Sequence, residues 1–442
     1  MIESLLIANR GEIARRVIRT ANRLGIRTIA VHSEADTGLP FVLEADEAVN
    51  IGPANPAQSY RNAEAILAAA KSTGAQAIHP GYGFLSENAD FARAVEANGL
   101  IWVGPPADAI AAMGDKINAR NLMAEAGVPV APGTHDPAAT VEAAIEAAAA
   151  IGYPVMVKAA AGGGGMGMAV ADDENGLRTE YDKVRAFAER MFGDGSVLIE
   201  RYFPRVRHIE VQILGLADGR VIALSERECS VQRRNQKLVE EAPSPAVDPA
   251  LRDRIKKAAV KAGEAVGYRN AGTVECLFDP ATGDFFFLEM NTRLQVEHPI
   301  TELIHGIDLV EQQLRVASGE PVTIPERTSG HAIELRVNAE DPKRFLPGPG
   351  TITTWVEPSG EGVRVDAGYT EGNVVTPFYD SLMAKLIVFG ADRDEAIARA
   401  RAAVAGFAIA GPKNNLPFFA ELLENDEFLA GDYDTGIVSR MR

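Results

Sequence analysis

Hydrophobic segments and helical patterns alternate along the first hundred residues. Runs of apolar residues predict four strands, at residues 4–8, 28–31, 76–79 and 100–103. After the first of them, apolar residues recur at helical spacing, at Ile13, Val17, Ala21 and Leu24. Similar patterns predict helices at residues 63–71 and 89–98. This alternation predicts a doubly wound, Rossmann-like α/β domain with a parallel sheet, whose ligands gather beyond the carboxyl ends of the strands.

The pattern changes twice further along the chain. Residues 130–203 predict a small α/β unit, with an Ala-rich helix at 141–151, strands at 155–158, 168–171 and 196–200, and a helix between the last two. From Arg207 onward, alternating segments separated by turns predict antiparallel strands, at 208–215, 219–228, 272–278 and 284–290. A helix is expected at 249–266, and the tail from Asp392 is mostly amphipathic helix. The whole chain is therefore predicted to be a multidomain protein of α/β and α+β parts.

Composition and charge argue against several classes of protein. The 442 residues include 44 Lys+Arg and 61 Asp+Glu, a net charge of −17, which argues against binding of a nucleic-acid backbone. The two cysteines, Cys229 and Cys276, are too few for a disulfide framework and suit a reducing compartment. The N-terminus lacks a secretory signal pattern, and no apolar run reaches 18 residues. We expect a cytoplasmic protein that binds neither nucleic acid nor membrane.

A glycine run follows the strand that ends in Lys158. Gly162 to Gly165 and Gly167 lie before another apolar strand, which matches neither a dinucleotide fingerprint nor a Walker A loop. Backbone without side chains can fold closely over phosphates, so a hairpin flap over a nucleotide is favoured over a flexible surface turn. Lys158 is either a phosphate contact or an edge lysine that reaches solvent.

The strands at 272–278 and 284–290 carry the most informative pattern. A hairpin centred near residue 282 places Glu275 opposite Glu289, within a residue of register. Opposed like charges are destabilising, so either a shared proton or a hard divalent cation must offset them. Strand alternation puts Asn291 and Arg293 on the face of Glu289, while Leu288 and Met290 face the core. A Mg²⁺–phosphate site is favoured over a solvated polar strand.

Two further segments and one residue indicate a functional site less strongly. HPGYGFLSEN at 79–88 is either a tight turn or part of a site at a strand end. Residues 227–243 contain Arg233, Arg234 and Lys237, either an anion-attracting patch or a solvated loop. Glu297 lies close to basic residues and could act as a general base, although a lone glutamate is more often solvated.

These motifs together resemble the biotin carboxylase component of biotin-dependent carboxylases, an ATP-grasp family. The resemblance covers nearly the whole chain. It depends on these segments: IANRGEIA (7–14), HPGYGFLSEN (79–88), GDK (114–116), VKAAAGGGG (157–165), RHIEVQ (207–212), QRRNQKLVEEAPS (232–244), EMNTRLQVEHPITE (289–302), ELRVNAED (334–341), FLPGPG (345–350) and YDS (379–381). It implies an ATP-grasp fold with an N-terminal doubly wound domain and a C-terminal mixed domain.

The resemblance also implies domain limits. The N-terminal biotin carboxylase domain would cover 1–113, a connecting helix 114–129 and the ATP-grasp flap 130–203. Residues 204–442 would complete the ATP site, with the biotin carboxylase C-terminal domain beginning at about 331.

The implied reaction is the carboxylation of biotin on a carrier protein with ATP and bicarbonate, through carboxyphosphate. ATP, Mg²⁺ (or Mn²⁺) and carrier-bound biotin are the implied cofactors and substrate. The implied ATP-binding residues are Lys116, Lys158, Gly163, Gly164, Gly165, Glu200, Phe203, His208, Gln232, Asn235, Glu275 and Glu289. The implied metal ligands are Glu275, Glu289 and Asn291, and the implied bicarbonate contacts are Lys237, Arg293, Gln295, Val296 and Glu297. Biotin would meet Arg336 and Asp380; the catalytic residues would be Glu297 as general base, Arg336, Lys237 and Arg293.

The chain departs from the family pattern at four positions, Met166, Ala169, Arg201 and Asn235. Met166 and Ala169 remove positive charge from the flap, so we expect weaker or slower closure over ATP. A biotinyl-lysine motif of the AMKM kind does not occur, so the carrier is expected on another chain or a downstream segment. The expected partners are a biotin carboxyl carrier protein and a carboxyltransferase, with an acyl-CoA carboxylase favoured, within a homodimer or larger complex. Two other hypotheses remain, another ATP-grasp ligase such as a carbamoyl-phosphate-synthetase-like enzyme, and a non-catalytic nucleotide-binding assembly protein.

Overall fold

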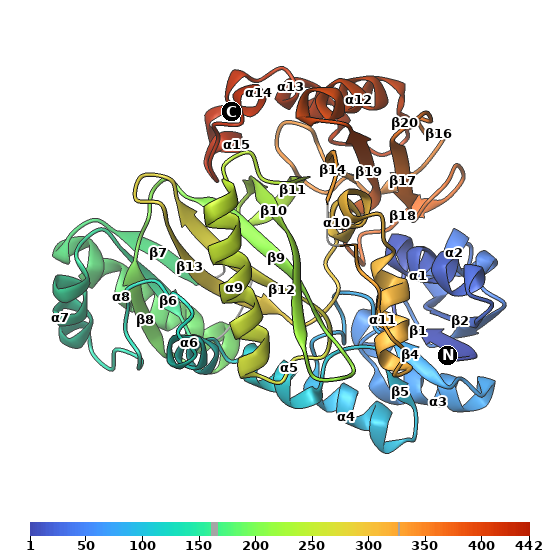
Figure 1. Ribbon diagram of the computed structural model, residues 1–442, viewed down its shortest axis with the longest axis horizontal. Helices are drawn as coiled ribbons and strands as arrows, with labels where there is room; N and C mark the ends of the chain where they lie inside the picture. The colour runs from blue at the N-terminus through green and yellow to red at the C-terminus, as the bar shows by residue number, and fades with distance from the viewer. Residues whose placement is uncertain (161–166, 326–327) are drawn as a thin grey trace.

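The computed structural model describes residues 1–160, 167–325 and 328–442, and its elements form the lobes seen in Figure 1. The N-terminal lobe contains a five-stranded sheet in the order β3-β2-β1-β4-β5, with every pairing parallel. Its strands are β1 (Ser4–Ile7), β2 (Arg27–His32), β3 (Glu47–Asn50), β4 (Ala77–His79) and β5 (Ile101–Trp102). Its helices are α1 (Gly11–Arg23), α2 (Pro40–Glu44), α3 (Ala63–Thr73) and α4 (Ala89–Ala97). The predicted doubly wound domain is confirmed; strand β3 was missed because its residues are mostly exposed and lack a hydrophobic run.

A small lobe projects from one side of the molecule, at the left of Figure 1. Its sheet has the order β7-β6-β8, and all three strands lie where the sequence predicts them. Its elements are β6 (Val155–Ala159), β7 (Met168–Ala171), β8 (Val197–Arg201), α7 (Val141–Ile151) and α8 (Glu174–Phe192). Two helices, α5 (Ala107–Gly114) and α6 (Lys116–Glu125), connect this lobe to the first one, where a single connecting helix was expected.

An antiparallel sheet of eight strands forms the centre of the molecule. Its order is β13-β12-β9-β10-β11-β14-β19-β17, so strands from beyond residue 330 continue the sheet that begins near residue 207. The strands are β9 (Arg207–Gly215), β10 (Val221–Arg233), β11 (Gln236–Ala242), β12 (Asn270–Asp279), β13 (Asp284–Asn291), β14 (His331–Asn338), β17 (Val363–Ala367) and β19 (Leu382–Gly390). Helix α9 (Pro249–Ala265) packs on one end through Ile255 and Ala259, which share a core with Ile213 and Val274. This continuity lets side chains from distant parts of the sequence share one face.

Most of the remaining elements belong to the C-terminal lobe, at the top of Figure 1. Helices α10 (His298–His305) and α11 (Leu309–Ala317) follow β13, and α11 lies lower, against α1 of the N-terminal lobe and β12. The tail is mostly helical, as predicted, with α12 (Arg393–Gly406), α13 (Leu416–Leu422), α14 (Asp426–Ala430) and α15 (Ile437–Arg440). Short strand pairs join β15 (Gly350–Thr351) to β18 (Val374–Val375) and β16 (Thr354–Val356) to β20 (Ala408–Ala410). One hydrophobic core contains both Val17 of the N-terminal lobe and Leu335 of β14, so these two lobes pack together.

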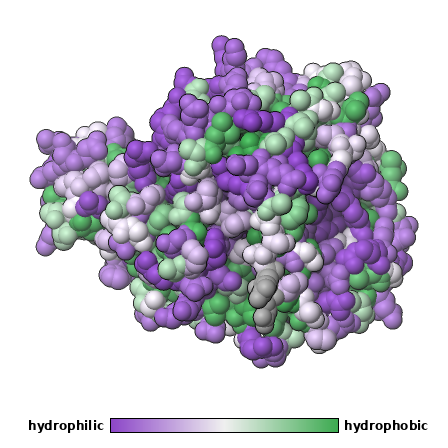
Figure 2. Space-filling view, turned by 45° about the horizontal axis from the view of Figure 1, so that its top comes forward, coloured by the Kyte–Doolittle hydropathy of each residue, from purple (hydrophilic) through white to green (hydrophobic). Residues whose placement is uncertain are grey.

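Hydrophilic residues cover much of the face shown in Figure 2, with hydrophobic residues in small groups between them. Among the described residues, no helix is both long and apolar enough to cross a membrane.

Candidate active site

The opposed carboxylates predicted from the sequence lie where expected. In the β12–β13 ladder Glu275 pairs with Glu289, and Thr273 pairs with Asn291. The register then shifts by one residue between Glu275 and Cys276, so the hairpin contains an irregularity at the pair. As a consequence Met290 is buried as predicted, whereas Leu288 is only half-buried.

Glu275 is surrounded by donors. Its carboxylate accepts hydrogen bonds from Lys237 Nζ at 2.9 Å, Asn291 Nδ2 at 2.9 Å and Gln295 Nε2 at 2.8 Å. His208 Nε2 lies 2.9 Å from its other oxygen. Burial opposes ionisation, but Lys237 and His208 outweigh it, so the pKa of Glu275 lies well below its ordinary value. Glu275 is therefore an ionised acceptor at neutral pH.

Glu289 has the opposite electrostatic environment. Burial and the neighbouring charge of Glu275 raise its pKa, and Lys237 and Lys116 offset this only in part. Asn291 Nδ2 lies 3.4 Å from Glu289 Oε1 and 2.9 Å from Glu275 Oε1, so the amide lies between the two carboxylates.

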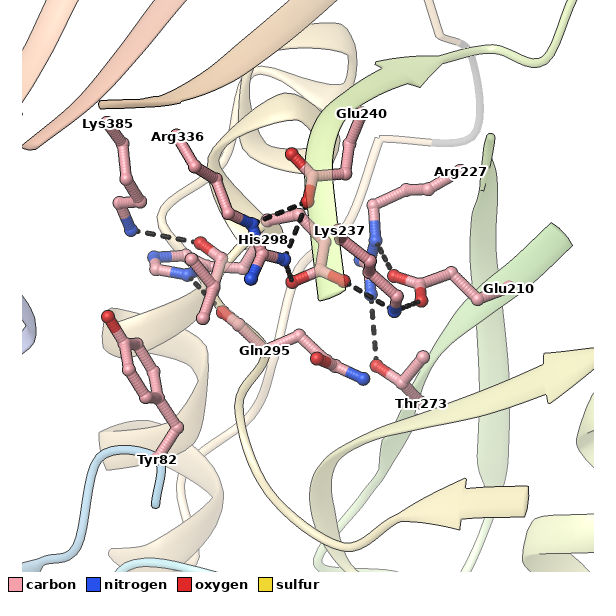
Figure 3. A network of polar contacts seen from close by, with 12 residues as sticks. Tyr82, Glu210, Arg227, Lys237, Glu240, Thr273, Gln295, His298, Arg336 and Lys385 are labelled. Carbon is pink, nitrogen blue, oxygen red and sulfur yellow. Dashed lines mark hydrogen bonds and ion pairs between the residues drawn. The ribbon is translucent and has the colours of Figure 1, made fainter. Parts of the chain in front are cut away.

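Lys237 lies at the centre of a network that Figure 3 shows in close-up. Its ammonium donates to Glu210, to Glu275 at 2.9 Å and to Glu297 at 2.7 Å. Burial disfavours the charged amine, but the three carboxylates outweigh it and hold the pKa of Lys237 well above its ordinary value. In residues 227–243, Lys237 is buried among these three carboxylates, whereas Arg234 and Asn235 are exposed in the turn, so the segment is neither a uniform basic patch nor a wholly solvated loop.

Arg336 links Glu297 to a further carboxylate. Its Nη2 donates to Glu297 Oε2 at 2.9 Å and its Nε donates to Glu240 Oε1 at 2.6 Å. Burial favours neutral Glu297, but Lys237 and Arg336 outweigh it, so its pKa lies well below its ordinary value. The carboxylate of Glu297 is thus ionised, fully buried and held between two cations.

The segment HPGYGFLSEN contacts the residues that follow β13. Glu87, near its end, accepts a hydrogen bond from Arg293 Nε at 3.0 Å. Arg293 also donates to Asn291 Oδ1 at 2.8 Å and to Gln295 Oε1 at 3.3 Å. Tyr82, from the middle of the segment, donates to Glu12. A loop at the carboxyl end of β4 therefore lies beside residues that follow β13.

Lys158 and Glu200 lie side by side in the sheet of the small lobe and form an ion pair. Arg120 of α6 lies 3.6 Å from Glu200. Lys116 begins α6, and its pKa is lowered by burial, although Glu289 and Glu200 offset part of the shift. The charges of Glu289, Lys158 and Glu200 all act on Lys116, so Lys116 lies between Glu289 and the Lys158–Glu200 pair.

The remaining residues predicted to bind ATP, bicarbonate or biotin lie in buried and in exposed positions. Phe203 stacks on Phe286 with ring centroids 4.9 Å apart, Gln232 is buried, and Val296 accepts at its backbone oxygen from Lys385 at 3.0 Å. Asp380 is exposed and accepts from the backbone of Leu382. Gly163, Gly164 and Gly165, and the departure at Met166, lie outside the described residues.

The residues present fit a divalent cation bound with phosphates. Glu275 and Glu289 face each other, and His208 and Glu210 place further ligand atoms near Glu275. Asn291 presents its N–H group to both carboxylates and its oxygen to Arg293, so the amide would have to turn over to act as a ligand. Burial and the charge of Glu275 raise the pKa of Glu289, and a hard cation between the two carboxylates would offset their repulsion.

Comparison with known proteins separates the families that share such a site. Residues 1–110 match the model of the biotin carboxylase N-terminal domain and residues 334–440 that of the biotin carboxylase C-terminal domain. Residues 115–324 match the ATP-binding domain of the carbamoyl-phosphate synthase L chain. The chain is 50% identical over 443 residues to biotin carboxylase 2 of Bacillus subtilis, with all of both chains covered. The chain belongs to the biotin carboxylase family.

Two further biotin carboxylase relatives agree with this assignment. The biotin carboxylase of Haemophilus influenzae is 48% identical over 435 residues, covering 98% of this chain and 97% of that protein. The biotin carboxylase domain dimer of Hydrogenobacter thermophilus 2-oxoglutarate carboxylase, solved with MgADP, ADP and bicarbonate, is 44% identical with a TM-score of 0.95. This match covers 100% of this chain and 98% of that one.

The sequence-based prediction of the family and of the ATP-grasp fold is confirmed. The chain is an ATP-dependent ligase, and the biotin carboxylase models at both ends distinguish it from other ATP-grasp ligases.

Sequence reasoning missed several charged residues in this candidate site. Arg227 is fully buried and donates to Glu210 at 2.5 Å and to Thr273 at 3.0 Å. Glu240 bonds to Arg336, and Glu87 bonds to Arg293. Alternating charged residues inside otherwise buried antiparallel strands were the available signal for Glu210, Arg227 and Glu240, because such charges must be paired.

Proposed function

We propose that this chain carboxylates biotin on a carrier protein, using ATP and bicarbonate through carboxyphosphate, with the residues of the Lys237 network as its catalytic centre. The observation that carries this proposal is the position of Glu297. Its buried carboxylate lies between Lys237 at 2.7 Å and Arg336 at 2.9 Å, two cations suited to hold a small anion beside a base.

In this proposal bicarbonate binds among Lys237, Arg293, Gln295, Val296 and Glu297. Glu297 removes the bicarbonate proton, and the resulting oxygen nucleophile attacks the γ-phosphorus of ATP, displacing ADP. The low pKa of Glu297 makes it a weak base while both cations bond to it. An anion that takes over the contacts of Lys237 and Arg336 would raise that pKa, so bicarbonate binding itself would prepare the base.

Lys116 and Lys158 would contact the ATP phosphates, and Glu200 and Phe203 would lie near adenine. His208, Gln232 and Asn235 would lie near the ribose and phosphates. Glu275, Glu289 and Asn291 would hold Mg²⁺, which supplies charge neutralisation on the transferred phosphoryl group. The glycine run would cover the phosphates and exclude water that hydrolyses carboxyphosphate.

Arg336 would stabilise the enolate form of biotin, and Asp380 would lie near it. The carrier and the carboxyltransferase would be separate partners or downstream segments, in a homodimer or larger complex in the cytoplasm. The domain limits would be 1–113, 114–129, 130–203 and 204–442, with the last domain divided near residue 331.

The variant Glu297→Gln tests the proposal. The measurement is ADP formation by the wild type and the variant, with and without bicarbonate and free biotin. The wild type should cleave ATP in response to both, and the variant should lose about a hundredfold or more of that rate because the base is gone. Binding of MgADP should be unchanged.

Glu302→Gln is the matched control. Glu302 lies on α10, which begins next to Glu297, is buried, and bonds to Arg16 and Arg364 instead of Lys237. A comparable loss of rate in this control, or wild-type ATP cleavage that ignores biotin, would contradict the proposed function.

A further inference from the structure

Arg336 is shared between two fully buried carboxylates. Its Nε lies 2.6 Å from Glu240 Oε1, and its Nη2 lies 2.6 Å from the same oxygen and 2.9 Å from Glu297 Oε2. Glu240 and Glu297 are both 0% exposed, whereas the Arg336 side chain is 14% exposed. One edge of the guanidinium is therefore held by Glu240 (Figure 3), while the Arg336 side chain remains partly accessible.

Glu240 has a second carboxyl neighbour, Glu334. The two residues are direct partners in the β11–β14 ladder, and Glu334 is two residues before Arg336 on the same strand. Glu334 is fully buried, and among the described residues neither of its carboxyl oxygens has a hydrogen-bond partner. Lys385 is the cation that acts on Glu334 most strongly, but it lies 3.1 Å from Glu12 and donates to the backbone of Val296.

Two opposed carboxyls in such a place cannot both be ionised. Burial raises the pKa of Glu240 to about 7, with Glu297 adding to the shift and Arg336 and Lys237 opposing it. Burial and Glu240 raise the pKa of Glu334 well above its ordinary value, against Lys385 and Arg336. Arg336 favours the charge on Glu240, the nearer partner, and the proton is then on Glu334.

We propose that Glu240 is a positioning residue for biotin carboxylation, which holds Arg336 in place and keeps it from closing fully on Glu297. This inference rests on the proposed roles of Arg336 and Glu297. Without Glu240, the Arg336 guanidinium would form its ion pair with Glu297 alone. That pair would make Glu297 a weaker base, and it would also move the charge of Arg336 away from biotin. Ionised Glu240 divides the charge of Arg336, and the proton on Glu334 favours that ionised form of Glu240.

The test compares Glu240→Gln with the wild type in biotin-dependent ATP cleavage, with free biotin as the substrate. Gln keeps the size of the side chain and removes its charge, so Arg336 should close on Glu297. We expect kcat to fall by about ten- to a hundredfold, the size of effect that a small misplacement of a reacting group produces. The dissociation constant of MgADP should stay within about twofold, because Lys116, Lys158 and Glu200 lie on other elements. Glu240→Asp, which restores the charge, should recover part of the lost rate.

Glu241→Gln is the matched control, because Glu241 is the next residue on β11, is equally buried and bonds to His331 and Arg393 instead of Arg336. It should lower thermal stability without the selective loss of kcat. Wild-type kcat in Glu240→Gln would overturn the inference, as would equal losses of kcat in both variants or equal impairment of Glu240→Asp and Glu240→Gln. If the wild type itself ignores biotin, the proposed function fails and this inference fails with it.

Discussion

Opposed glutamates in one hairpin have opposite tendencies to ionise. Glu275 accepts hydrogen bonds from Lys237 and from two side-chain amides and lies beside His208, so its pKa is lowered. Glu289 faces it across the ladder, and burial together with the charge of Glu275 raises its pKa. A divalent cation would therefore stabilise Glu289 more than Glu275, because only Glu289 lacks adequate compensation.

Glu289→Gln should raise the Mg²⁺ concentration needed for ATP cleavage. The variant loses a carboxylate ligand where the cation is most needed, so half-maximal activity should require about tenfold more Mg²⁺ or more. A Mg²⁺ titration at fixed ATP measures this. Asp284→Asn is the control, because Asp284 is exposed at the other end of β13. An unchanged Mg²⁺ requirement in Glu289→Gln would rule out this residue as a metal ligand.

The turn between β10 and β11 shows how one element places Lys237. Arg234 has φ = +49° and Asn235 has φ = +65°, so two consecutive residues adopt the left-handed conformation that a tight hairpin requires. Asn tolerates this conformation better than most residues, which gives a structural reason for Asn at this departure from the family pattern. The turn sets the β10–β11 register, in which Lys237 pairs with Gln232.

Asn235→Ala should lower the free energy of unfolding by about 1 kcal/mol, because a Cβ without a compensating side-chain hydrogen bond disfavours positive φ. Chemical denaturation measures the change, and Asn235→Gly should keep the wild-type value or exceed it. MgADP binding, measured on both variants, separately tests the proposed contact of Asn235 with the nucleotide. Equal stability of the Ala and Gly variants would show that the turn conformation is not limiting.

At the scale of the whole molecule, Glu241 joins parts of the chain that are far apart in sequence. Its carboxylate accepts from His331 at 2.6 Å, from Arg393 at 2.7 Å and 3.0 Å, and from Tyr433 at 2.5 Å. Burial favours its neutral form, but the hydrogen bonds from His331 and Arg393 outweigh this and lower its pKa to about 2. The carboxylate thus ties the central sheet to α12 and to the C-terminal segment.

Acid should weaken this connection in a defined pH range. Because the pKa of Glu241 is lower in the folded chain than its ordinary value of 4.5, its contribution is present above pH 4.5. That contribution is lost as the pH falls from 4.5 towards 2, and it amounts to the order of ~3 kcal/mol. Glu241→Gln should be less stable than the wild type at neutral pH, and the difference should shrink as the pH falls through this range. Denaturation at several pH values measures it; a constant difference would exclude this linkage.

Much of the architecture and one part of the site followed from the sequence alone. Alternation of apolar residues is a local property, so the parallel N-terminal sheet, the helix at 141–151 and the antiparallel region from Arg207 were predictable. The turn between residues 279 and 284 set the opposition of Glu275 and Glu289 to within one residue, because a short hairpin leaves few registers. The family could also be predicted from the sequence, because each of its long motifs is a continuous segment and the motifs occur in the family's order.

The tertiary structure alone decided which charges meet. Lys237 bonds to residues from β9, β12 and the segment after β13, Arg336 joins β14 to β11, and Glu87 reaches Arg293 from another lobe. Such pairs depend on strand order in the eight-stranded sheet and on how the lobes pack, and no local pattern encodes either. The same packing removes water from these groups. Burial has the largest influence on the pKa values of Glu240, Glu275 and Glu297, and it exists only once the chain has folded.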